Sequence, residues 1–265
     1  MRLSLSAALA AIGILAGSAV SAACGNTSAG FEQWKASFAQ TAQRAGVGQR
    51  GLQALASARY SNGTIAADRN QKSFKYSLEK FMQVRGSATI IAQGRKRLAR
   101  DAKFYSALEE IYGVPPGVII AIHGMETAFG GFMGDTPVVS AITTLAYDCR
   151  RSDFFIPHAI GALQLVDMGS ITAATQGAKH GELGHTQFLP GNALRYGVDI
   201  DRNGRVDFYN QSDALASTAN FLASKGWRRG AGFQQGQPNF AVIKEWNAAT
   251  VYQQAIAIMG AEIMR

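Results

Sequence analysis

A strongly apolar helix is predicted near the middle of the chain, over residues 118–129. The preceding residues, 112–117, contain a glycine that can end one helix and two consecutive prolines that can begin the next. Gly130 and Gly131 follow the apolar run and predict its end. A helix with so few polar side chains is typical of a protein core.

Helical periodicity also dominates the rest of the chain. Apolar residues recur every three or four positions over 31–42, and further helices are predicted over 74–81, 154–168 and 212–225. Alternating strand patterns are scarce, and the best short candidate covers residues 205–208. We therefore predict a mainly α-helical protein with a short β element, in which residues 55–100 are candidates for a small additional helical lobe.

Composition and charge limit the possible functions. The chain has 265 residues, of which 47% are hydrophobic and 17% charged, and these values exclude disordered, collagen-like and coiled-coil proteins. The formal net charge of +8 favours an acidic polymer as partner: a nucleic acid, an anionic membrane or an anionic cell-wall glycan. Charge alone does not choose among them.

Residues 1–23 have the pattern of a secretory signal. Arg2 is followed by an apolar run and then by small residues of the kind that signal peptidase accepts. We expect this segment to be cleaved, and residues 24–265 to form one domain in the periplasm. A transmembrane anchor is not expected, because the run is short and no second apolar stretch of about 18 residues follows. A lipid anchor on Cys24 is less favoured, because Ser21 stands where a large aliphatic residue is expected.

The chain has two cysteines, Cys24 and Cys149. In an oxidising compartment an even number of distant cysteines favours a disulfide over two free thiols. The bridge would attach the start of the mature chain to the body of the protein.

Glu126 is the most informative candidate for chemistry. It lies four residues after Ile122 and seven after Ile119, and therefore on the buried stripe of the predicted helix. Burial disfavours the ionised carboxylate and raises its pKa, as a general acid working near neutral pH requires. The alternative is a glutamate near a helix end that reaches solvent or bonds to the backbone.

Other familiar catalytic patterns are missing from the sequence. It contains no His-Glu-x-x-His, no Gly-x-Ser-x-Gly and no Walker loop, and its four histidines show no zinc-ligand spacing. Metal-dependent hydrolysis, serine hydrolysis and nucleotide chemistry therefore become less favoured. Nucleic-acid binding is not expected either, because the basic residues belong to no recognisable module.

Residues 199–204 match the first half of an EF-hand calcium loop, with oxygen-bearing side chains at positions 1, 3 and 5 and glycine at position 6. These residues are Asp199, Asp201, Asn203 and Gly204. Position 12 is Asn210 in place of glutamate, so another carboxylate must complete the site, and Asp207 and Asp213 are the candidates. The alternative is an acidic turn that holds no ion.

Five motifs, taken in order, resemble the lytic murein transglycosylases of the membrane-bound B type, glycoside hydrolase family 103. They are YGVPP at 112–116, GMETAFG at 124–130, TLAYDCRR at 144–151, GHTQFLP at 184–190 and NFLASKGW at 220–227. The resemblance extends from about residue 31 to the last residue. It implies a lysozyme-like helical core and cleavage of the bond between N-acetylmuramic acid and N-acetylglucosamine in peptidoglycan.

The resemblance also implies roles for individual residues. Glu126 matches the single acid/base of the family, and Gln187 matches a substrate-binding glutamine. Arg150 and Arg151 match an arginine pair near the saccharide and its peptide. Two aromatic residues of the same motifs, Phe188 and Phe221, are further candidates for substrate contacts.

The oxygen-rich loop resembles the calcium site of the family. Its implied ligands are Asp199, Asp201, Asn203, the Arg205 carbonyl and, as the distal carboxylate, Asp213. We expect this calcium to be structural, and we expect no organic cofactor. Ala178, His185 and Phe221 depart from residues that are common in the family, which leaves the preferred glycan open.

The implied reaction forms 1,6-anhydro ends, because the C6 hydroxyl of the sugar attacks C1. One carboxylate then suffices, although Asp148, Asp153 and Glu182 remain candidates for a second acid. The alternatives are a muramidase-type hydrolase of the same fold and a peptidoglycan-binding protein without activity. We expect a monomer whose partner is the glycan strand; protein partners are not predicted.

Overall fold

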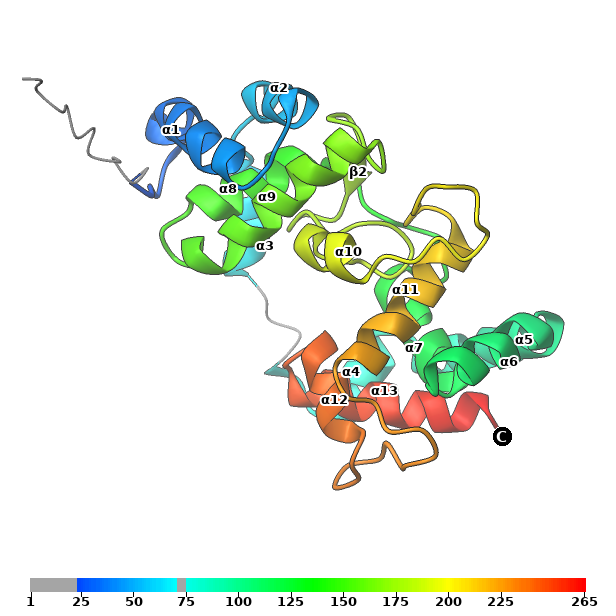
Figure 1. The fold of residues 1–265 in the computed structure, drawn as a ribbon. Coiled ribbons are helices and arrows are strands. Elements are labelled where there is room, and N and C mark those ends of the chain that lie inside the picture. The colour runs from blue at the N-terminus through cyan, green and yellow to red at the C-terminus, as the bar shows by residue number, and fades with distance from the viewer. Residues whose placement is uncertain (1–22, 71–74) are drawn as a thin grey trace, which may run out of the picture.

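The computed structural model describes residues 23–70 and 75–265, and α-helices dominate it (Figure 1). Most of the predicted signal segment, residues 1–22, and Phe74 of the predicted helix over 74–81 lie outside the described residues. None of the helices in the described part of the chain is long and apolar enough to cross a membrane. The prediction of a mainly α-helical protein is confirmed.

The elements of the described residues follow one another along the chain. They are η1 (Ser28–Gly30), α1 (Phe31–Arg44), α2 (Gln49–Ser57), α3 (Asn62–Arg69), α4 (Leu78–Val84), α5 (Ser87–Arg100), α6 (Ala102–Tyr112), α7 (Pro116–Thr127), β1 (Thr136–Pro137), α8 (Val138–Tyr147), α9 (Ser152–Met168), β2 (Gln176–Gly177), α10 (Pro190–Tyr196), α11 (Gln211–Ser224), α12 (Phe240–Trp246) and α13 (Thr250–Ile263).

The helices form two packed groups. In one group α9 packs against α2, α8 and α10, and in the other α7 packs against α5, α6, α11 and α13 (Figure 1). Helices α10 and α11 connect the groups. The segment 55–100 is divided between them, because α3 packs against α8 whereas α4 and α5 pack against α13.

Helix α7 is the centre of the second group. Every residue of α7 except Glu126 is buried. Pro115 and Pro116 begin the helix, in agreement with the sequence. It ends at Thr127, two residues earlier than predicted, because Ala128 and Phe129 adopt positive φ angles of 49° and 64°.

Glycines allow α7 and α13 to approach closely. A Cβ atom on Gly117 would lie 2.1 Å from the carbonyl oxygen of Gly260, so only glycine fits at this crossing. The contact fixes how α13 lies along α7, and so fixes the side chains that α13 presents toward Glu126.

The only sheet in the described residues has two very short strands. β1 pairs with β2 in antiparallel fashion, with Thr136 opposite Gly177. The strand predicted over 205–208 is wrong, because this segment is irregular. Two of its backbone N–H groups bond to side chains instead: the Arg205 N–H donates to Asn203 Oδ1 at 3.0 Å and the Asp207 N–H to Asp213 Oδ2 at 2.9 Å.

The predicted disulfide between Cys24 and Cys149 is confirmed. Next to it, the Gly25 N–H donates to the Tyr147 carbonyl at 3.0 Å, and the Cys149 N–H donates to the Gly25 carbonyl at 3.3 Å. The start of the described chain is thereby attached to the end of α8.

A methyl group at the α7–α13 crossing should destabilise the protein. We expect Gly117→Ala to lower the free energy of unfolding by about 1–3 kcal/mol, because the new Cβ forces the two helices apart. Urea denaturation measures this change. Gly63→Ala, on the exposed surface of α3, is the matched control and should leave stability unchanged or raise it by up to about 1 kcal/mol. Equal stability of Gly117→Ala and wild type would contradict the tight crossing.

Loss of the disulfide should also destabilise the folded state. The bridge joins residues 125 positions apart, and cross-links over long loops typically stabilise by about 2–4 kcal/mol. We expect the double variant Cys24→Ser, Cys149→Ser to lose about this much in the same denaturation experiment. A reductant should destabilise wild type and have no effect on the double variant; a reductant that leaves wild type unchanged would contradict the prediction.

Candidate functional site

A cavity of about 350 Å³ lies where the two helix groups meet. Residues from α7, α9, α10, α11, α12, the loop between β2 and α10 and the segment after α12 form its walls. They include Glu126, Arg151, Phe154, Ala178, His180, Glu182, Gln187, Phe188, Asn192, Phe221, Trp246 and Asn247. The cavity contains Glu126 and most of the predicted substrate-binding residues.

Glu126 is held by two hydrogen-bond donors from the C-terminal helices. Its Oε1 accepts a hydrogen bond from the Tyr252 hydroxyl at 2.6 Å and another from Trp246 Nε1 at 3.2 Å. Burial raises the pKa of the Glu126 carboxyl, although both hydrogen bonds oppose the shift. The carboxyl therefore contacts the cavity and neighbouring side chains, and the raised pKa agrees with the sequence prediction.

Tyr252 and Trp246 are functional candidates that the sequence analysis missed. They lie 126 and 120 residues after Glu126, and no local motif joins them to it. Burial and the neighbouring Glu126 hold the pKa of Tyr252 well above its ordinary value, so its hydroxyl stays a donor. The close packing of α13 on α7 brings Tyr252 to Glu126, and α12, which packs against α13, brings Trp246.

Phe188 and Phe221 lie in the cavity wall but are deeply buried, with 2% of each residue exposed. Both rings pack edge-on against Trp246, at centroid distances of 5.0 and 5.2 Å. Both rings thus contact the indole that bonds Glu126. They pack against a side chain that holds Glu126, and they offer little surface to a ligand.

Gln187 lines the same cavity, in a tight turn. Its φ angle of 57° is unusual for a residue other than glycine. Its side-chain amide donates to the Gly184 carbonyl at 2.8 Å and the Met133 carbonyl at 3.4 Å. Leu183 and Phe188 exchange backbone hydrogen bonds across the turn. The hydrogen bonds of the Gln187 side chain and those between Leu183 and Phe188 therefore hold Gln187 in its positive-φ conformation.

Two histidines join this turn to α7. His123 Nε2 lies 3.0 Å from His185 Nδ1, and the Thr127 hydroxyl donates to the His185 carbonyl at 2.6 Å. Burial lowers the pKa of His123 to about 3, so its ring is neutral. These contacts join the turn that contains Gln187 to the helix that carries Glu126. The two histidines therefore have a structural role.

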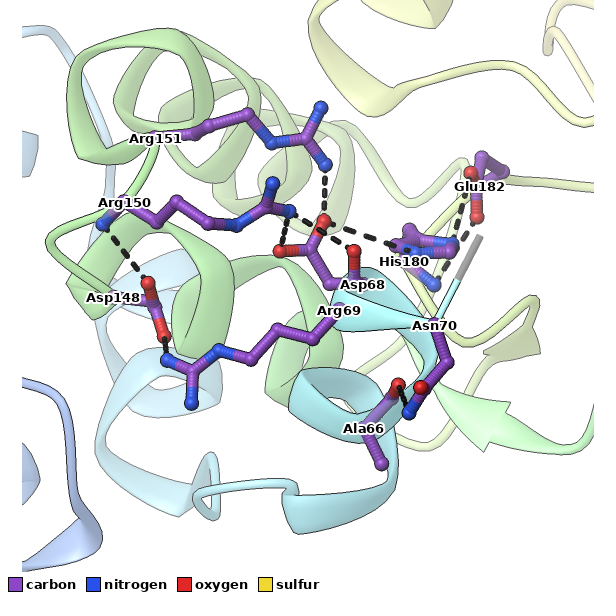
Figure 2. A network of polar contacts seen from close by, with 9 residues as sticks. All are labelled: Ala66, Asp68, Arg69, Asn70, Asp148, Arg150, Arg151, His180 and Glu182. Carbon is purple, nitrogen blue, oxygen red and sulfur yellow. Dashed lines mark hydrogen bonds and ion pairs between the residues drawn. The ribbon is translucent and has the colours of Figure 1, made fainter. Parts of the chain in front are cut away.

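The two predicted arginines share one buried carboxylate. Arg150 and Arg151 both donate to Asp68 on α3, whose side chain is 2% exposed (Figure 2). Arg151 lines the cavity, whereas Arg150 is not part of its lining. Asp148 accepts hydrogen bonds from Arg69 at 2.6 Å and from the Arg150 N–H at 2.9 Å. Asp68 was not predicted from the sequence.

Glu182 also lines the cavity and contacts His180. Its Oε2 accepts a hydrogen bond from the His180 N–H at 3.2 Å, and its Oε1 lies 3.6 Å from His180 Nδ1. His180 Nε2 lies 3.9 Å from Asp68 Oδ1 (Figure 2). Burial raises the pKa of Glu182 to about 7.

The oxygen-rich loop lies apart from this cavity. Asp199, Asp201 and Asp213 each place a carboxylate oxygen within 4.8 Å of the others. Asp213 is buried at the start of α11, whereas Asp207 pairs with Arg205 at 3.2 Å. Of the two candidates for the distal carboxylate, Asp213 is therefore the one in the cluster.

Asn210 and Asn203 have other contacts in this loop. The Asn210 side chain accepts from the Ser212 N–H and caps α11, and it donates to Asp201 at 3.0 Å. The backbone N–H of Asn203 donates to both Asp199 and Asp201. These bonds hold the carboxylates in place.

Known proteins resemble this chain in sequence and in fold. The sequence profile of the transglycosylase SLT domain matches residues 30–237. The membrane-bound lytic murein transglycosylase B of Escherichia coli is 32% identical over 123 residues, which are 46% of this chain and 34% of that protein. The matched region thus spans about a third of the length of that relative.

Solved structures share the fold. SltB3 from Pseudomonas aeruginosa, in complex with NAG-anhNAM-pentapeptide, has a TM-score of 0.80 and 26% identity, over 88% of this chain and 79% of that one. The E. coli lytic transglycosylase Slt35 in complex with calcium has a TM-score of 0.71 and 21% identity, over 86% and 92%. These likenesses confirm the lysozyme-like helical fold. Because the profile covers most of the chain, the resemblance drawn from the five motifs is also confirmed: the chain belongs to the transglycosylase SLT domain family.

Proposed function

We propose that this protein is a peptidoglycan lytic transglycosylase. It would cleave the β-1,4 bond between N-acetylmuramic acid and N-acetylglucosamine and leave 1,6-anhydro-N-acetylmuramic acid ends. One observation carries the proposal: Glu126, the one residue of α7 that is only partly buried, brings a carboxyl of raised pKa to the cavity. SltB3 has been solved in complex with NAG-anhNAM-pentapeptide and with NAG-NAM-pentapeptide, which supports the substrate class.

The raised pKa of Glu126 suits the first step of this reaction. The protonated carboxyl donates its proton to the glycosidic oxygen while positive charge develops at C1 of the muramic acid residue. The hydrogen bonds from Tyr252 and Trp246 then stabilise the carboxylate that remains.

The second step regenerates the acid. The carboxylate of Glu126 takes the proton of the C6 hydroxyl, whose oxygen attacks C1. No water is consumed, and one carboxylate suffices because the substrate supplies the nucleophile, unlike in ordinary glycosidases. A muramidase-type hydrolase would instead add water, so its reducing ends would be about 18 Da heavier than anhydro ends, the mass of one water.

Substrate binding is assigned to residues of the same cavity. Gln187 lines the cavity from the strained turn, and Arg151 adds a cation to its wall at the residue that precedes α9. The net charge of +8 suits peptidoglycan, because its stem peptides carry carboxylates. Export to the periplasm follows from the signal pattern, and the disulfide between Cys24 and Cys149 supports an oxidising compartment.

Glu126→Gln should abolish turnover. The amide has nearly the same shape and can accept the same two hydrogen bonds, but it has no acidic proton to donate. General acid catalysis typically contributes about 10²- to 10⁴-fold, and we expect a loss of at least this size. Mass spectrometry of products from purified sacculi measures turnover and identifies the ends. Sedimentation with sacculi is the control for binding, which should persist. More than about a tenth of wild-type activity in Glu126→Gln would contradict the role of the residue.

A calcium ion fits the cluster formed by Asp199, Asp201 and Asp213. Three carboxylates in close contact repel one another, and among the described residues no lysine or arginine forms an ion pair with any of the three. Hard cations prefer such oxygen ligands. We assign Asn203 and the Arg205 carbonyl as the remaining ligands. The ion would neutralise the cluster and stabilise the loop, away from the bond that is cleaved.

Calcium should therefore raise the melting temperature, because an ion that binds the folded state stabilises it by mass action. We expect weak binding, with Kd on the order of 10⁻⁴ to 10⁻³ M, since Asn210 replaces the bidentate glutamate. Asp199→Ala should remove the increase and retain activity at low temperature. Asp135→Ala, which removes an exposed carboxylate elsewhere, should keep the increase. If millimolar calcium neither releases or absorbs heat in a calorimetric titration nor changes the melting temperature, the loop holds no ion.

A further inference from the structure

A second carboxyl shares the cavity with Glu126. Among the described residues that line it, Glu126 and Glu182 are the acidic ones. They come from different elements, Glu126 from α7 and Glu182 from the loop between β2 and α10. A saccharide in the cavity would therefore lie within reach of two carboxyl groups from separate parts of the fold.

The structure distinguishes Glu182 from the other two candidates for a second acid. Asp148 is 2% exposed, bonds to Arg69 and the Arg150 N–H, and lies outside the cavity lining. Asp153 is exposed in the first turn of α9 and borders a neighbouring hollow. Neither of them reaches the cavity of Glu126.

Glu182 is held in place by a chain of polar contacts. Its two oxygens face the backbone N–H and the ring of His180, at 3.2 and 3.6 Å. The opposite side of that ring faces Asp68, which binds Arg150 and Arg151 (Figure 2). The carboxyl is therefore positioned by α3 and by the start of α9, as well as by its own loop.

We propose that Glu182 is a second functional carboxylate of the cleft, whose negative charge stabilises the cation that develops at C1 while Glu126 moves the proton. This inference rests on the proposed function. The bond between C1 and the glycosidic oxygen breaks, and that oxygen receives the Glu126 proton. The bond between C1 and the C6 oxygen forms, and its proton returns to Glu126. Glu182 begins and ends the reaction ionised, so atoms and charge balance.

The charged groups around Glu182 determine how it titrates. Burial raises its pKa to about 7, and the Glu126 charge from α7 acts in the same direction, whereas Arg151 at the start of α9 opposes it. His180, with Asp68 behind it, has a pKa lowered by burial and by both arginines. Because the two glutamates are neighbours, they release their protons in two steps that belong to the pair.

The active form is then the singly protonated pair in which Glu126 carries the proton and Glu182 is ionised. Activity should rise with pH as the pair loses its first proton and fall as it loses the second, which gives a bell-shaped profile. A variant with only one carboxyl in the cavity loses a single proton, and that loss inactivates it. Its activity should therefore lack the acid limb and fall only on the alkaline side.

Glu182→Gln tests the charge without changing the shape of the side chain. The amide oxygen can still accept the His180 N–H, so the loop is expected to keep its structure and the melting temperature its wild-type value. We expect kcat to fall about 100- to 1,000-fold, as when one electrostatic group of a catalytic site is removed. KM should stay within about twofold of wild type, the acid limb should vanish, and the fraction of anhydro ends should not change.

Two further variants complete the experiment. Glu182→Asp keeps the charge and should restore the acid limb together with part of kcat. Glu110→Gln makes the same chemical change on the exposed surface of α6 and should match wild type in rate and pH profile.

Each contrary result has its own meaning. If wild type forms anhydro ends while Glu182→Gln keeps its rate and its acid limb, Glu182 has only a structural role. If Glu182→Gln yields a larger share of anhydro ends, Glu182 activates water and the proposed charge stabilisation is wrong. If wild type forms no anhydro ends, the proposed function itself is wrong.

Discussion

The enclosure of α7 is the constraint on which the rest of the structure depends. A helix buried along its length must be covered by neighbours on all sides, and α5, α6, α11 and α13 provide that cover. The same enclosure leaves Glu126 partly buried, whereas every other residue of α7 is fully buried. Removing water from this carboxyl raises its pKa. The packing that encloses α7 therefore also raises the pKa of Glu126.

A partly buried carboxyl is costly unless hydrogen bonds compensate for the lost water. Tyr252 and Trp246 provide these bonds: Tyr252 belongs to α13, which covers α7, and Trp246 ends α12, which packs against α13 and α11. The close contact of Gly117 with Gly260 sets how α13 lies on α7. Phe188 and Phe221 then pack edge-on against Trp246. The position of the acid thus depends on packing several residues away from it.

The sequence predicted the features that a short segment determines by itself. The apolar run predicted a core helix that carries Glu126 with a raised pKa. The spacing of acidic residues predicted the oxygen-rich loop, and the even number of cysteines predicted the disulfide. Tyr252 and Asp68 could not be predicted in this way, because each meets its partner across a distant part of the chain. The strand predicted over 205–208 was wrong for a related reason: Asp213, on the next helix, takes the backbone bond that a neighbouring strand would have made.

The network around Asp68 shows how one cluster can serve both stability and binding. A buried carboxylate needs cationic or hydrogen-bonding partners, because an unpaired buried charge is strongly destabilising. Asp68 has two such partners, Arg150 and Arg151, both of which are partly exposed. One negative charge cannot neutralise two guanidinium groups, so this cluster keeps a net positive charge, with Arg151 in the cavity wall. Arg151 therefore brings positive charge to the cavity that Glu126 and Glu182 also line. The site thus combines an acidic centre, which suits bond cleavage, with a basic border, which suits an anionic polymer.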